Sequence, residues 1–141
     1  MTVVVDSSVS LAWCFEDEQT EAVMTLLDRV AEAGAIAPQL WPLEVLNGLL
    51  MAERRGRLDG ARRQRLAGLL QSLPIMIDAE TAGQAWSAVA RLAEQFRLTA
   101  YDAAYLELAQ RRNFPLATLD QQLRAAGKTL GVTLLGTAQG P

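Results

Sequence analysis

The sequence predicts an α/β fold, a three-layer α/β/α arrangement around a mostly parallel five-stranded sheet. Short runs of β-type residues alternate with longer segments of helical periodicity, an order typical of parallel sheets with helices on both faces. The first run, Val3–Val5, is β-branched throughout and ends at Asp6, the pattern of a strand buried on both faces. With 141 residues, half of them hydrophobic and 21% charged, the chain has the size and composition of one globular domain.

Five strands are expected, and in chain order they cover residues 3–5, 35–37, 75–77, 116–118 and 132–135. The longer segments between them are expected to be helices, over residues 18–33, 42–56, 59–73, 82–96, 99–108 and 123–126. Gly34 ends the first of these helices, Pro42 suits the first turn of the second, and Asp59 caps the third. Thr99 and Asp102 have the spacing of a capping box.

Apolar stripes along three of these helices are predicted to pack on the core. They are Leu43, Leu46 and Leu50; then Leu66, Leu69, Leu70 and Leu73; then Ala82, Ala85, Trp86, Val89 and Phe96. Trp86 is therefore interpreted as a core residue. The single cysteine, Cys14, has apolar neighbours and is predicted to be a buried, unreactive thiol, and no internal disulfide can form.

The predicted domain covers residues 1–135, followed by a flexible C-terminal tail over residues 136–141. No segment approaches the roughly 18 apolar residues of a membrane span. The N-terminus lacks the basic region of a signal peptide. A cytoplasmic protein without membrane contact is therefore expected.

The composition excludes several kinds of catalysis. The chain contains no histidine, which rules out imidazole acid–base catalysis, Ser-His-Asp triads and histidine-liganded metals. An enzyme with this composition must work with carboxylates and hydroxyls.

Four acidic residues are expected at one edge of the sheet. In a parallel α/β sheet, the C-terminal ends of the strands and the N-terminal ends of the following helices share the edge where ligands bind. Asp6 and Asp120 follow the first and fourth strands, and Glu44 and Asp102 lie in the first turns of helices. Asn47 lies three residues beyond Glu44, on the same helical face.

Taken singly, each acid has a simpler explanation, because acidic side chains cap helix N-termini and gain about 0.3–1 kcal/mol from the helix dipole. Taken together, four converging carboxylates without a nearby Lys or Arg would repel and raise one another's pKa. A shared divalent cation is the simplest compensation. Oxygen ligands without His or Cys indicate Mg²⁺, with Mn²⁺ as a substitute.

Five segments, taken in order, are similar to one family. They are VVVDSSV, APQLWPLEVLNGL, RRGRLDG, RLTAYDAAYLELAQRRNFPLATLD and the apolar strand after Gly131. With these segments the chain resembles a PIN domain, and most closely the toxin nucleases of bacterial VapBC toxin–antitoxin pairs. The segments span nearly the whole chain at typical spacing, so the ordered set is specific although each piece alone is weak.

The resemblance implies a metal-dependent endoribonuclease, since in that family the four matching acids bind divalent metal and cleave RNA. Asp6, Asp102 and Asp120 would hold Mg²⁺ directly, and Glu44 would bind it or orient the attacking water. Many relatives carry a further Asp or Asn shortly after the position of Asp120, where this chain has Gln121-Gln122-Leu123. This pattern fits either one metal ion or two, and a second ion would be held loosely. The expected supporting residues are Ser7, Asn47 and Thr118.

A basic segment follows an acidic one. Residues 1–53 contain nine acidic side chains and a single Arg29, and the next residues include Arg54, Arg55 and Arg57. These arginines are interpreted either as solvated helix ends or as a patch that grips RNA phosphates. A contact with an antitoxin is the third interpretation. The resemblance implies two protein partners, a cognate antitoxin and a second copy of the chain.

Two rival functions fit a similar sheet. A receiver domain or an aspartyl phosphohydrolase needs a second acid near Asp6, and the receiver also needs a Lys after the last strand. Asp6-Ser7-Ser8 lacks that acid, and Lys128 precedes the last strand. A catalytically idle PIN-like interaction module would have the same fold, but none of the four acids is missing.

Overall fold

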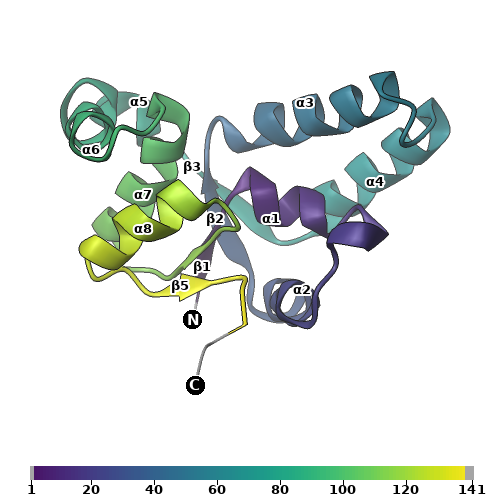
Figure 1. The fold of residues 1–141 in the computed structure, drawn as a ribbon, viewed down its shortest axis with the longest axis horizontal. Coiled ribbons are helices and arrows are strands. Elements are labelled where there is room, and N and C mark those ends of the chain that lie inside the picture. The colour runs from purple at the N-terminus through teal and green to yellow at the C-terminus, as the bar shows by residue number, and fades with distance from the viewer. Residues whose placement is uncertain (1, 139–141) are drawn as a thin grey trace.

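The computed structural model describes residues 2–138, which form a five-stranded sheet between layers of helices (Figure 1). The strands are β1 (Val3–Val5), β2 (Ala35–Pro38), β3 (Ile75–Asp78), β4 (Leu116–Ala117) and β5 (Leu134–Leu135). Their order across the sheet is β3-β2-β1-β4-β5, and every neighbouring pair is parallel. The predicted fold class is confirmed.

The helices lie where the sequence pattern places them, with additions. They are α1 (Ser7–Ala12), α2 (Glu21–Ala33), α3 (Trp41–Arg54), α4 (Gly60–Ser72), α5 (Thr81–Gln84), α6 (Ala90–Phe96), α7 (Ala100–Arg112) and α8 (Gln121–Thr129). The six-residue helix α1 was not expected, because it is short and contains the β-branched Val9 and three serines. A 3₁₀ turn over Glu16–Glu18 precedes α2, so the first predicted helix begins at Glu21, after the N-cap Thr20.

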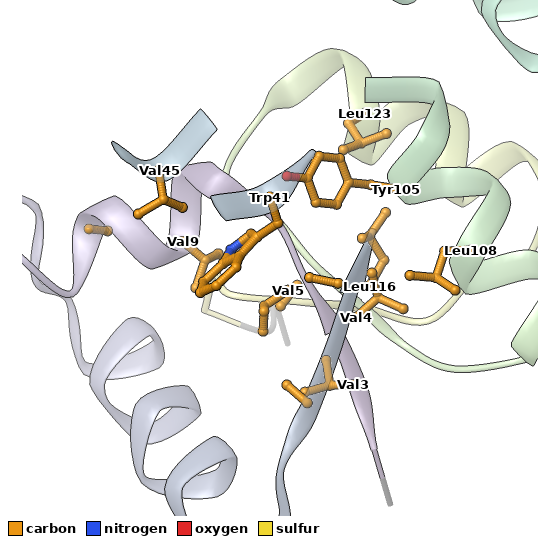
Figure 2. Close-up of a cluster of buried hydrophobic side chains, with 14 of the residues drawn as sticks. Val3, Val4, Val5, Val9, Trp41, Val45, Tyr105, Leu108, Leu116 and Leu123 are labelled. Atoms are coloured by element: carbon orange, nitrogen blue, oxygen red, sulfur yellow. The ribbon is translucent and has the colours of Figure 1, made fainter. Parts of the chain in front are cut away.

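Helix α7 packs directly on the central strands β1, β2 and β4, with α8 and α6 beside it. Figure 1 shows α5 to α8 on one side of the sheet, with α1 to α4 on the other. The core lies between these layers, around strand β1, whose three valines are fully buried. Figure 2 shows Trp41 and Val9 packed on one side of β1, and Tyr105 and Leu108 on the other.

A buried hydrogen-bond relay joins the start of α3 to the end of β1. The indole Nε1 of Trp41 donates to Ser10 Oγ at 2.9 Å, and Ser10 Oγ donates to the carbonyl oxygen of Asp6 at 2.8 Å. Because Trp41 is the first residue of α3, this relay fixes the N-terminal end of that helix against the loop that carries Asp6.

Trp86 was predicted to lie in the core, and this prediction is wrong. Its side chain is 94% exposed, while Val89 and Leu92 are buried. The segment is not one continuous α-helix, because a π-helical turn over Ala85–Val89 separates α5 from α6. A π turn has wider residue spacing, so the apolar positions that share one face of an ideal α-helix no longer do so.

The predicted stripe of α3 is also wrong in part. Leu43 is 72% exposed and Leu46 is 40% exposed, whereas Val45 and Leu49 are buried. Helix α3 is apolar on more than one side, so its spacing alone does not identify the core face. In α4, Leu66 and Leu70 are buried as predicted, but Leu69 is 63% exposed.

Cys14 is buried, as predicted. Burial raises the pKa of its thiol to about 11, so the thiol stays protonated at neutral pH. No helix within residues 2–138 is long and apolar enough to cross a membrane. Of the predicted tail, Gly136 is buried beside the backbone of Thr118, and residues 139–141 lie outside the described residues.

Candidate active site

The four predicted acids come from the loops and helix starts at the C-terminal edge of the sheet. Asp6 follows β1 and caps α1, since its Oδ1 accepts a hydrogen bond from the backbone N–H of Val9. Asp120 follows β4 and caps α8 in the same way, accepting from the N–H of Leu123. The capping explanation is therefore confirmed for these two aspartates.

Asp102 lies in the first turn of α7, where its backbone N–H donates to Oγ1 of the N-cap Thr99. Glu44 lies in the first turn of α3, on the opposite side of the sheet from α7. Capping therefore accounts for the positions of Asp6 and Asp120, and the helix dipole favours Asp102 and Glu44 in the first turns of their helices.

Asp6 is held by three hydrogen bonds in a nearly closed environment, with only 4% of its surface exposed. Its Oδ1 accepts from Ser8 Oγ at 2.7 Å as well as from the N–H of Val9, and its Oδ2 accepts from Thr118 Oγ1. Ser8 Oγ in turn accepts from the N–H of Leu119 at 2.9 Å. The carboxylate is thus fixed in orientation by residues from two strand ends.

Thr118 links two of the acids directly. Its hydroxyl donates to Asp6 Oδ2 and accepts from the backbone N–H of Asp120 at 3.0 Å. Thr118 is fully buried, so these two partners use both hydrogen-bonding roles of its hydroxyl without competition from water. The structure therefore gives Thr118 the supporting position expected from the sequence.

Glu44 is held from the opposite side, by α7. The hydroxyl of Tyr105 donates to Glu44 Oε1 at 2.6 Å, and Ser7, the first residue of α1, acts to lower the pKa of both side chains. Burial, together with the Glu44 carboxylate, raises the pKa of Tyr105 far above its ordinary value, so its hydroxyl remains a donor at any physiological pH. Asn47 lies exposed one turn further along α3.

The carboxylates interact electrostatically through Asp102. Burial, with a smaller contribution from the charge of Asp102, raises the pKa of Asp6 to about 6 against the effect of its hydrogen bonds. Burial and then Asp102 raise the pKa of Glu44, although Tyr105 and Ser7 act in the opposite direction. Burial and the charge of Asp120 raise the pKa of Asp102 itself. Asp102 therefore raises the pKa of Asp6 and of Glu44, and Asp120 raises the pKa of Asp102.

The donor set suits a hard cation. All the donors are oxygen atoms, and no arginine or lysine contributes to the pKa shifts of Asp6, Glu44 or Asp102. Among the groups that shift these pKa values, no positively charged side chain offsets the repulsion between the acids. Within residues 2–138, however, no three acidic or cysteine side chains are grouped closely enough to form a ready-made metal site. The residues fit a metal ion by chemistry and electrostatics, and the side chains must draw together to ligate one.

The three candidate arginines differ in their surroundings. Arg54 and Arg55 are exposed at the end of α3, about 15 Å along the helix axis from Glu44. Arg57 instead pairs with Asp17 at 3.2 Å and Glu18 at 3.4 Å, and its guanidinium lies 4.2 Å from the centre of the Phe15 ring. The charge of Arg57 is already partly neutralised by the protein.

Sequence reasoning missed two residues of this site. Ser8, which orients Asp6, stands beside the predicted Ser7 and has no distinguishing pattern. Tyr105 is 1% exposed and lies among apolar residues of α7, so it resembles an ordinary core residue. The signal that would have found it is its spacing, because Tyr105 lies three residues after Asp102 and so on the same side of the helix.

The sheet is all-parallel, and the four acids come from the loops and helix starts at its C-terminal edge. The PIN domain family model matches residues 3–129. The chain therefore belongs to the PIN-domain family.

Within that family the similarity is to VapC proteins. The chain is 32% identical over 127 residues to Ribonuclease VapC3 of Pyrobaculum aerophilum, covering 87% of this chain and 92% of that protein. Solved structures show the same fold. PAE2754 of Pyrobaculum aerophilum has a TM-score of 0.70 and 24% identity, over 95% of this chain and 83% of that one. VapC20 of Mycobacterium tuberculosis, a toxin that cleaves the sarcin–ricin loop, has a TM-score of 0.65 and 18% identity, over 89% of this chain and 95% of that one.

Proposed function

We propose that this protein is a Mg²⁺-dependent endoribonuclease that hydrolyses RNA phosphodiester bonds, and that it acts as the toxin of a toxin–antitoxin pair. The observation that carries the proposal is the set of four carboxylates coupled through Asp102 at the C-terminal edge of the sheet. The similarity to a protein named a ribonuclease, over most of both chains, supports the substrate.

In this proposal Asp6, Asp102 and Asp120 hold Mg²⁺, for which Mn²⁺ substitutes, and Glu44 binds the ion or orients the attacking water. A bound Mg²⁺ lowers the pKa of water and offsets charge on the scissile phosphate. Thr118 ties the carboxylate of Asp6 to the backbone of Asp120, because its hydroxyl donates to Asp6 Oδ2 and accepts from the N–H of Asp120. A bound cation would also offset the charge repulsion among these carboxylates.

The ends of the RNA products test the proposed reaction. Attack by water with cleavage of the P–O3′ bond leaves a 5′-phosphate and a 3′-hydroxyl, whereas attack by the RNA 2′-hydroxyl breaks the P–O5′ bond and leaves a cyclic phosphate. The second route commonly uses paired imidazoles, and this chain has no histidine. We expect products with 5′-phosphate ends when end-labelled RNA is incubated with the purified protein and Mg²⁺. Products that end in a cyclic 2′,3′-phosphate, or RNA that stays intact, would overturn the proposal.

Arg54 and Arg55, at the far end of α3 from Glu44, are proposed to contact phosphates of the same RNA. Replacing both with Ala is expected to weaken the binding of single-stranded RNA. It should also reduce the slope of log K against log salt by about 1.4, or about 0.7 for each lost phosphate contact. Binding is measured over a salt series in EDTA, so that the RNA stays intact.

Arg57→Ala is the matched comparison, because Arg57 is paired with Asp17 and Glu18. We expect a smaller change of slope from this variant. A salt dependence that is the same in the double variant and the wild type would exclude Arg54 and Arg55 from the RNA interface.

Two protein partners are part of the proposal, a cognate antitoxin and a second copy of the chain in the cytoplasm. Both are supported by large apolar side chains at the surface, Trp86 at 94% exposure and Leu43 at 72%. A groove of about 220 Å³ between α3 and α4 adds apolar surface next to Leu43 and Leu46. A catalytically idle interaction module would use the same surfaces, but it has no need of four coupled carboxylates.

A further inference from the structure

One hydrogen bond crosses from α7 to α3 inside the site. The hydroxyl of Tyr105 lies 2.6 Å from Glu44 Oε1, a short distance that marks a strong hydrogen bond to a carboxylate. Tyr105 is 1% exposed, so its ring is fixed by packing, and Figure 2 shows its hydroxyl directed toward the Trp41 side and away from Leu108. Glu44 is only partly buried, so the tyrosine supplies a rigid contact to a more mobile side chain.

The same hydrogen bond sets the relation between two acids that repel each other. Asp102 precedes Tyr105 by three residues on α7, so the helix carries both groups on neighbouring turns. Without a partner, the carboxylate of Glu44 would turn away from Asp102 toward solvent. The Tyr105 hydroxyl holds it in place, and Ser7 at the start of α1 acts to lower the pKa of the same carboxylate.

We propose that Tyr105 is a positioning residue that fixes Glu44 next to Asp102, so that Glu44 is ready to act on a divalent cation or its water. The role rests on the proposed function. Tyr105 itself touches neither cation nor substrate and acts only through Glu44. Residues that orient metal ligands in this way change metal affinity or activity by about 10- to 100-fold when they are replaced.

Tyr105→Phe tests the role, because it removes only the hydroxyl and keeps the buried ring. We expect the dissociation constant for Mg²⁺, measured by calorimetry with the metal alone, to rise about 10-fold. We expect kcat for RNA cleavage to fall by at least that factor, with KM for RNA unchanged. Tyr101→Phe is the matched control, since Tyr101 lies one turn earlier on α7 and is 64% exposed. It should leave both quantities at wild-type values.

A double-mutant cycle separates positioning from a general structural effect. If Tyr105 acts through Glu44, then Tyr105→Phe adds no further loss of Mg²⁺ affinity to a Glu44→Gln protein. Ser7→Ala, which removes a second hydroxyl that favours the charged form of Glu44, provides a second variant and should shift affinity in the same direction as Tyr105→Phe. Melting temperatures of all variants show that each is folded.

Equal Mg²⁺ affinity in the wild type and Tyr105→Phe, including no binding by either, would overturn the positioning role. Equal losses from Tyr105→Phe in the wild-type and Glu44→Gln backgrounds would also overturn it. A wild type that binds Mg²⁺ but leaves RNA intact, together with weaker binding by Tyr105→Phe, supports the positioning role and overturns the proposed function. Calorimetry and cleavage therefore distinguish the two failures.

Discussion

Asp102→Asn is expected to lower the rate of RNA cleavage by at least about 100-fold, the loss typical when one charged or polar group of a catalytic site is removed. Asp102 is the acid most connected to the others, since it is electrostatically coupled to Asp6, Glu44 and Asp120. Asparagine keeps the size of the side chain and removes the charge that a cation needs. Asp6→Asn is expected to abolish cleavage for the same reason.

The fold is expected to survive Asp102→Asn, because Thr99 caps α7 through the backbone N–H of residue 102 and not through its carboxylate. The melting temperature without metal should be unchanged or higher, since a source of repulsion is lost. Asp28→Asn, which removes an exposed carboxylate from α2, is the matched control and should cleave at the wild-type rate. Wild-type cleavage by Asp102→Asn would refute the assignment of the site.

Arg111→Met is expected to lower the free energy of unfolding by about 3 kcal/mol, the cost typical of leaving buried charges without a partner. Arg111 on α7 pairs with Asp78 at 2.8 Å and with Glu107 at 2.6 Å, and the side chains of both acids are 4% exposed. It also pairs with the exposed Glu80 at 2.8 Å. Methionine keeps the apolar stem and leaves two buried carboxylates unpaired.

The pH dependence of this loss has a definite sign. Burial alone would raise the pKa of Asp78, but the hydrogen bonds and charge of Arg111 outweigh burial and hold it below 3.8. The pair therefore stabilises the wild type above that pH, and the contribution is lost as pH falls through the lowered pKa. We expect the difference between Arg111→Met and the wild type, measured by urea unfolding, to be largest near neutral pH and smaller near pH 3.

Arg112→Met is the matched control for Arg111→Met. Arg112 is the next residue on the same helix, is exposed, and lies 5.9 Å from the centre of the Phe114 ring. We expect it to change the free energy of unfolding by less than about 1 kcal/mol. Equal losses from the two variants would mean that the ion pairs of Arg111 contribute nothing beyond an exposed arginine.

The fold was predictable because the strand and helix signals are local. The run Val3–Val5 and its following Asp6 identified the central strand, and capping residues such as Asp59 marked helix starts that the structure confirms. What failed needed information that sequence spacing does not carry. Trp86 looked like a core residue because a π turn cannot be read from an apolar repeat, and Leu43 looked buried because α3 is apolar on more than one side.

The site was predictable to a similar degree. Topology places the ends of β1 and β4 at one edge, so Asp6 and Asp120 were expected near each other, and Thr118 joins them in the structure. The contact between Tyr105 and Glu44 was not expected, because it crosses between two helices on opposite sides of the sheet. Such a contact depends on how α3 and α7 pack, and this packing cannot be predicted from a single sequence.

The most direct test of the central claim is the initial rate of RNA cleavage as Mg²⁺ is raised from zero, measured for the wild type and Asp102→Asn. We predict no cleavage by the wild type in EDTA, activation that saturates as Mg²⁺ is added, and no comparable activation of Asp102→Asn. Cleavage that persists in excess EDTA, or equal activation of both proteins, would contradict the proposal that the four carboxylates act together through a bound cation.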